Sequence, residues 1–237
     1  MKEIDPTPAV LRELDRAAER LLTAAATLDD AAVTAPSRLP GWTRAHVLSH
    51  LAAQAPALER LLTWARTGVR NDQYAGREAR DAEIEAGALL PAAALVARVR
   101  ESARSWQRAV ETLPGPAWDA TIVPFTGETC TPRRILVIRL RELVLHLVDL
   151  DAGPELADIP ATARDIVLDD VVGYYAEAEK VPAFTLSDAE GMELARFDGG
   201  GPLVRGARAE LLAWLSGRGD GALLDAPGGL PVLPPWI

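Results

Sequence analysis

The segment 131–150 carries the residue types best suited to chemistry in this chain. It is almost entirely apolar and opens with a Thr-Pro helix start, yet it holds Glu142 and His146 four positions apart. At that spacing a carboxylate and an imidazole project from one helix face and can bind the same divalent cation. His50, on a separate helical segment, supplies a second imidazole. His50, Glu142 and His146 are therefore a candidate zinc site with an open position for water or substrate, although nickel, iron or manganese also accept these ligand types.

Two further polar residues, Arg139 and Asp149, lie on the same helix face, giving successive spacings of 3, 4 and 3. Polar side chains on a buried helix are costly unless they are paired or bind a metal. A purely structural interpretation pairs Arg139 with Glu142 and His146 with Asp149. In the metal-site interpretation, Arg139 or Asp149 would instead hold the ligands in place from behind.

His46 lies one turn before His50 and decides whether such a site would be open. A histidine beside an apolar stripe is more often structural than a ligand. If His46 bound the metal as a fourth ligand, the position needed for chemistry would be closed. The single cysteine, Cys130, has no adjacent histidine and is not expected to act as a nucleophile.

Four long helical patterns occupy the first 150 residues and must position these side chains. They cover about 7–28 (with Thr7 as N-cap), 43–66, 91–113 and 131–150, separated by loops rich in proline and glycine. A charged segment, 77–86, is expected to be solvated on most of its surface. The pattern predicts a helical bundle, a fold in which metal sites are built from facing side chains in the core.

The sequence changes character after residue 150. A Gly-Pro break is followed by a helix over about 160–180, short strands near 184–186, 192–197 and 203–204, and a last helix over 207–216. This pattern predicts a small α+β domain. We therefore expect a bundle domain over residues 1–153 and an α+β domain over residues 154–237.

Charge and hydropathy exclude several classes of partner. The formal net charge is −9 and there is no run of lysine or arginine, which argues against nucleic acid or an anionic membrane surface. No apolar run approaches membrane-spanning length, and the N-terminal residues lack the apolar core of a signal peptide. We expect a cytoplasmic protein.

Four segments of the chain resemble the mycothiol-dependent maleylpyruvate isomerases. They are GWTRAHVLSHLA (41–52), RDAEIEAG (80–87), RELVLHLVDLDAG (141–153) and RGARAELLAWLSGRGDG (205–221). Their order and spacing match over nearly the whole chain. The resemblance implies a DinB-like four-helix bundle that binds zinc, followed by a smaller α/β domain similar to sterol-carrier proteins. It also implies that His50, Glu142 and His146 are the zinc ligands.

The resemblance further implies a reaction. The thiol of mycothiol would bind the open zinc position as a thiolate, add to the cis double bond of maleylpyruvate, allow rotation and then leave, giving fumarylpyruvate, a step of aromatic degradation. An arginine of the C-terminal domain would be catalytic; Arg218 matches that motif best, and Arg205 and Arg208 are weaker candidates. The implied partners are a small dicarboxylate and a low-molecular-weight thiol, and we expect a monomer.

Two other functions are compatible with the same residues. A zinc-dependent mycothiol S-transferase would use the same ligands on another electrophile, because activation of a thiol does not dictate the acceptor. A non-catalytic binding protein on this scaffold would hold no stoichiometric metal, or a metal closed off by a fourth ligand such as His46.

Overall fold

The protein is described by a computed structural model that covers residues 8–234; Thr7, the predicted N-cap of the first helix, lies outside the described residues. The chain forms two compact units, and the boundary between them along the sequence lies between Pro154 and Glu155. The first unit is helical, and the second combines helices with a small sheet.

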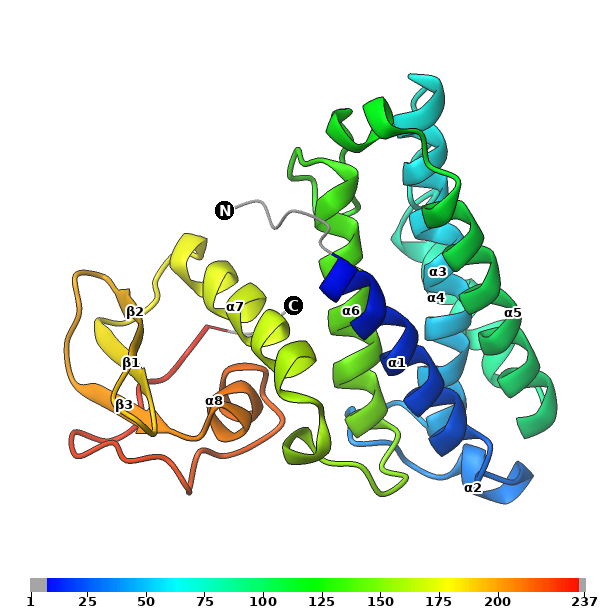
Figure 1. Ribbon diagram of the computed structural model, residues 1–237. Helices are drawn as coiled ribbons and strands as arrows, with labels where there is room; N and C mark the ends of the chain where they lie inside the picture. Colours follow the sequence, from blue (N-terminus) through cyan, green and yellow to red (C-terminus); the bar gives the residue numbers. More distant parts are fainter. Residues whose placement is uncertain (1–7, 235–237) are drawn as a thin grey trace. The chain divides into compact units, whose positions relative to one another are not determined.

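Four long helices build the first unit and lie side by side in Figure 1: α1 (Pro8–Ala25), α3 (Arg44–Thr67), α5 (Ala92–Glu111) and α6 (Pro132–Asp149). Helix α3 packs against both α5 and α6, and α1 packs against α6. Apolar side chains from all four helices are fully buried between them. Helix α6 is apolar nearly all round because it is buried along most of its length.

Two short α-helices and the 3-10 helix η1 (Gly115–Asp119) complete the described part of the bundle unit. Helix α2 (Asp30–Thr34), which the sequence analysis missed, follows α1, and α4 (Arg77–Ala88) packs on α3. The hydroxyl of Ser49 donates a hydrogen bond to the carbonyl oxygen of Ile84 at 2.8 Å. A side chain at Gly87 would collide with the Ser49 hydroxyl and lie 3.1 Å from its Cβ. Glycine therefore permits the close approach of α4 to α3.

A set of hydrogen bonds ties the start of α3 to the end of α6. The Arg44 Nε donates to the carbonyl oxygen of Leu150 at 2.6 Å, and the Arg38 amide donates to that of Asp149 at 2.9 Å. Arg44 also forms an ion pair with Asp151. These bonds satisfy carbonyl groups that a helix end leaves without partners, and they fix the position of α6 relative to α3.

The second unit contains α7 (Ala161–Glu177), β1 (Phe184–Asp188), β2 (Glu193–Phe197), β3 (Leu203–Gly206) and α8 (Arg208–Leu215). The strand order is β2-β1-β3, with β1 antiparallel to β2 and parallel to β3 (Figure 1). Phe184 and Phe197 stack with ring centroids 4.4 Å apart. Gly217 ends α8 with φ 72°, a conformation that glycine adopts without strain. The predicted fold class, a four-helix bundle followed by a smaller α+β part, is confirmed.

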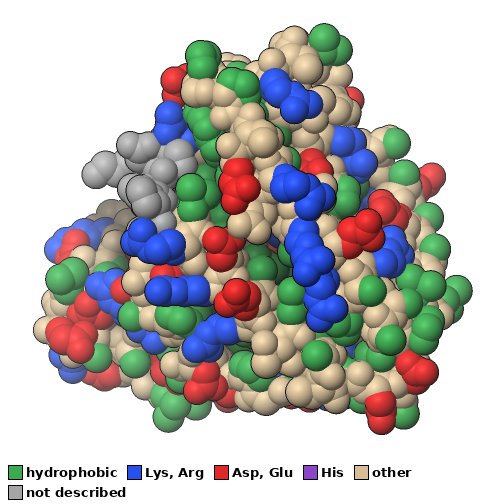
Figure 2. All heavy atoms as spheres, turned by 45° about the vertical axis from the view of Figure 1, so that its right-hand side comes forward, with side chains coloured by type: hydrophobic (Ala, Val, Ile, Leu, Met, Phe, Trp, Pro, Cys, Tyr) green, Lys and Arg blue, Asp and Glu red, His purple; other side chains and the backbone are tan. Residues whose placement is uncertain are grey.

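Charged side chains of both signs are spread over the face shown in Figure 2 and are not separated into a basic and an acidic half. No helix within residues 8–234 combines the length and the apolar character needed to cross a bilayer.

Candidate metal centre

Helices α3 and α6 bring two imidazoles and a carboxylate together inside the bundle. The Nε2 of His50 lies 2.8 Å from the Oε2 of Glu142, and the Nε2 of His146 lies 3.2 Å from the same oxygen. One ligand atom from each of the three residues falls within 4.8 Å of the other two. The structure brings together the three residues predicted from the sequence, with His50 on the helix that faces Glu142 and His146. Such a donor set suits zinc or another divalent transition metal.

Asp149 fixes the orientation of one imidazole. Its side chain is fully buried, and the Nδ1 of His146 lies 2.8 Å from its Oδ2. Because an ionised carboxylate can only accept a hydrogen bond, this contact favours a proton on Nδ1, and in the neutral imidazole it leaves Nε2 free to bind a metal. A carboxylate behind a histidine is the usual outer support of a metal ligand.

The electrostatics of the cluster keep the carboxylate ionised. Burial raises the pKa of Glu142, but hydrogen bonds from His146 and His50 outweigh burial, and the pKa falls well below its usual range. Burial lowers the pKa of His50. For His146, burial acts in the same direction, but hydrogen bonds to Asp149 and Glu142 prevail and raise the pKa. A negative charge at the centre of two imidazoles is an environment that attracts a cation.

His46 lies outside the cluster because the start of α3 uses it. Its Nδ1 accepts a hydrogen bond from the Thr43 amide, while Thr43 accepts one from the His46 amide, so the two residues form a capping box. The other ring nitrogen of His46 lies 3.3 Å from Glu85. Within residues 8–234 the cluster contains only His50, Glu142 and His146. Three protein ligands leave room for a further ligand.

Arg139 does not pair with Glu142 in the way that the structural interpretation of α6 predicts. Its buried guanidinium reaches across to α3, where Nη1 donates to the Gln54 side chain at 2.6 Å and to the Leu51 carbonyl at 3.2 Å. Burial lowers the pKa of Arg139 to about 10. The ion pair that Glu142 forms with an arginine of its own helix is with Arg141, at 3.6 Å. The His146–Asp149 pair of that interpretation is present.

The three candidate arginines lie in the second unit. Arg205 is paired with Asp225 at 2.8 Å, and Arg208 bridges two aspartates, at 3.1 and 3.2 Å. The Nη1 of Arg218 donates to the carbonyl oxygen of Ser216 at 2.8 Å. Arg205 and Arg208 are thus each held by carboxylates of their own unit. A catalytic role for Arg218 stays a prediction.

A pocket of about 350 Å³ opens in the first unit between α3 and α4. Tyr74, Arg80 and Glu83 are among the residues that line it. The pocket could not be predicted from the charge pattern of the sequence, because the charged segment 77–86 is typical of a solvated helix surface. The signal that could have found it is the pair of small or apolar residues Ile84 and Gly87, which dock α4 against α3.

Comparisons with known proteins agree with this description. Residues 14–151 match the family described as the mycothiol maleylpyruvate isomerase N-terminal domain. A crystal structure of the mycothiol-dependent maleylpyruvate isomerase is similar over 98% of both chains, with 26% identity and a TM-score of 0.90, and a histidine-to-alanine mutant of that enzyme gives the same values. A search of curated protein sequences found no match.

A more distant similarity supports the fold alone. YfiT from Bacillus subtilis, described as a probable metal-dependent hydrolase with an unusual four-helix bundle topology, matches with 18% identity and a TM-score of 0.53. The match covers 64% of this chain and 88% of YfiT. Bundle, cluster and family match coincide in residues 14–151, and the chain belongs to the mycothiol maleylpyruvate isomerase N-terminal domain family.

Proposed function

We propose that this protein is a cytoplasmic, zinc- and mycothiol-dependent isomerase, active as a monomer, that converts maleylpyruvate to fumarylpyruvate by thiolate addition, rotation about the former double bond and elimination. The supporting observation is the convergence of His50, Glu142 and His146 in a chain that belongs to this family. The solved relative with a TM-score of 0.90 is a mycothiol-dependent maleylpyruvate isomerase.

The chemistry of the donor set fits a bound zinc ion. Two Nε2 atoms face one carboxylate oxygen, the carboxylate is ionised, and Asp149 holds His146 in the tautomer that a ligand needs. Zinc bound there would lower the pKa of a coordinating thiol, so that the thiolate is present at neutral pH.

The chain's own residues then have distinct tasks. His50, Glu142 and His146 would hold the metal, and burial of His50 between Trp42 and His146 keeps its ring in one orientation, with ring centroids 5.6 and 4.9 Å away. Arg218 would bind a carboxylate of the substrate, because a guanidinium forms two parallel hydrogen bonds to that group. Its position just past α8, beside Gly217, leaves the side chain at a helix end.

The test combines elemental analysis with an isomerase assay in the presence and absence of mycothiol. We expect about one zinc per chain in the wild type, and loss of the metal and of activity in His50→Ala and His146→Ala. His46→Ala is the matched control, because this third histidine lies outside the cluster, and it should keep its zinc. Retention of stoichiometric zinc by both cluster variants would show that the metal lies elsewhere.

The same assay separates the two other functions. A zinc-loaded protein that is inactive on maleylpyruvate but transfers mycothiol to another electrophile is an S-transferase. A protein without stoichiometric zinc and without either activity is a binding protein on this scaffold.

A further inference from the structure

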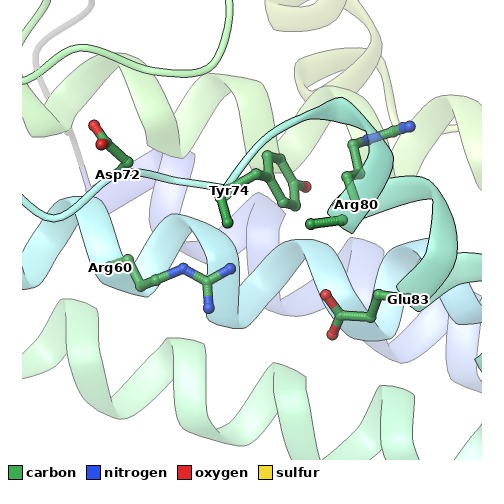
Figure 3. A pocket seen from close by; sticks show the side chains of 7 residues that line it. Arg60, Asp72, Tyr74, Arg80 and Glu83 are labelled. Atoms are coloured by element: carbon green, nitrogen blue, oxygen red, sulfur yellow. The ribbon is translucent and has the colours of Figure 1, made fainter.

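The pocket between α3 and α4 has the lining of a site for a polar ligand. Its walls include Arg60 from α3, Asp72 and Tyr74 from the connecting loop, and Ala79, Arg80 and Glu83 from α4. Figure 3 shows Tyr74 between Asp72 and Arg80, with the side chains of Arg60 and Glu83 pointing toward each other across the pocket. Its volume of about 350 Å³ lies within the range of small-molecule sites.

The charges of this lining balance, which favours an uncharged ligand. The lining holds two arginines and two carboxylates, so its formal charges cancel and a dianion gains no net attraction. The guanidinium groups are also engaged already: Arg60 donates through Nε and Nη2 to the Gln73 carbonyl, at 3.0 and 2.8 Å, and Arg80 donates to Asp81 at 2.8 Å. The Nε/Nη2 edge of Arg60 is therefore not free to form two parallel hydrogen bonds to a substrate carboxylate.

What the pocket does offer suits a ring rich in hydroxyl groups. The carboxylate of Glu83 is exposed and forms no hydrogen bond or ion pair with the described part of the chain, so it can accept bonds from hydroxyl groups. Tyr74 is 9% exposed and contributes both a flat ring and a phenolic hydroxyl. Arg80 lies over that ring, with its guanidinium carbon 6.0 Å from the ring centroid.

The pocket and the candidate metal centre share helix α3, which carries Arg60 of the pocket and His50 of the cluster. Ser49, which precedes His50, donates its hydroxyl to the carbonyl of Ile84, which follows Glu83. Ser49 and Ile84 thus form a hydrogen bond between α3 and α4. The candidate ligand His50 and the pocket residue Glu83 are each adjacent in sequence to one of these two residues.

We infer that this pocket binds the neutral polyhydroxylated part of mycothiol, its glucosamine–inositol unit, while the thiol end reaches the metal centre. Mycothiol is suited to this division because an amide arm joins its cysteine sulfur to two hydroxyl-rich rings without net charge. The inference rests on the proposed function, since it deepens the use of mycothiol at the same site. Glu83 and Tyr74 would be the residues that distinguish mycothiol from simpler thiols.

Calorimetric titration of the zinc-loaded protein tests the assignment with two thiols. One is mycothiol, and the other is N-acetylcysteine amide, which carries the same reactive end without the rings. We expect Glu83→Gln and Tyr74→Phe to weaken mycothiol binding roughly three- to tenfold each, because the first removes the charge that strengthens a hydrogen bond and the second removes a hydrogen bond. Binding of N-acetylcysteine amide should not change. Glu78→Gln is the matched control, because Glu78 is exposed on the same helix and does not line the pocket.

Three results would overturn the assignment. In the first, both thiols bind the wild type equally well. In the second, the two pocket variants weaken both thiols by the same factor, or neither. In the third, the KM for maleylpyruvate rises while mycothiol affinity is unchanged, which would make the pocket a carboxylate site. A protein that is inactive on maleylpyruvate but loses its preference for mycothiol in Glu83→Gln would retain the pocket assignment and refute only the proposed reaction.

Discussion

Replacing Gly87 by alanine tests how closely α4 packs against α3. Alanine favours a helix over glycine, and by itself this would stabilise α4 by about 1 kcal/mol. At this position the added Cβ would collide with the Ser49 hydroxyl and lie 3.1 Å from both the Ser49 Cβ and the Arg98 Nη1. The collision therefore opposes the helix preference.

The size of the penalty follows from what Ser49 would lose. Its side chain is 1% exposed, and its hydroxyl donates to the Ile84 carbonyl. Turning the hydroxyl away leaves a buried donor without a partner, at about 1–3 kcal/mol, and the remaining overlap adds roughly 1 kcal/mol or more. After subtracting the helix preference, Gly87→Ala should lower the free energy of unfolding by about 1–3 kcal/mol.

Urea denaturation followed by circular dichroism measures this change. The control is Gly173→Ala, because Gly173 lies inside α7 and nothing is within 4 Å of the position of its added Cβ. That variant should be more stable than the wild type by roughly 0.5–1 kcal/mol, as helix preference alone dictates. If Gly87→Ala also raised the free energy of unfolding, the inference of a tight contact between α3 and α4 would be refuted.

Three other variants test separate parts of the structure. Arg44→Ala should lower the unfolding free energy by about 1–3 kcal/mol, measured in urea, because the Leu150 carbonyl loses its 2.6 Å bond; an unchanged midpoint would contradict this. Asp149→Asn should weaken zinc binding about 10–100-fold in chelator competition at pH 7, and undiminished affinity would rule out its supporting role. For Asp188, burial raises the pKa, but hydrogen bonds from a backbone amide and from Arg208 outweigh burial and lower it, so the ionised form stabilises the fold above the unfolded pKa of about 3.9. That contribution disappears as the pH falls through the lower pKa of the folded state. Thermal melts should show Asp188→Asn less stable than the wild type at neutral pH, and the difference in melting temperature should shrink in acid. A difference in melting temperature that does not change with pH would refute the linkage.

The bundle could be predicted because its signals are local. The Thr-Pro start and the apolar run predict α6, and Thr43 marks the start of α3. The end of α1 was predicted at Leu28, but the helix ends at Ala25. The parallel pairing of β1 with β3 could not be predicted, since it joins segments that no single turn connects.

The candidate site shows what spacing can and cannot decide. Glu142 and His146 share a face whatever the tertiary structure, so their proximity follows from helix geometry. His46 and His50 lie one turn apart near the start of α3, and the fold shows that His50 is the one that faces α6. The spacing Thr43–His46 was itself a signal, because the third helical position commonly bonds back to the N-cap residue. Arg139 was placed correctly on the polar face, but its partner Gln54 comes from another helix.

The hydrogen bonds from Arg44 and Arg38 to the last carbonyl groups of α6 affect how long a metal ion would stay bound at the cluster. Helix termini normally fray, and His146 lies within about 6 Å of helix rise from Leu150. A ligand on a fraying turn would release its ion each time the turn opened. With this end fastened, amide exchange around His146 should be as slow as in the bundle interior, and ion release should then depend on opening of the bundle as a whole.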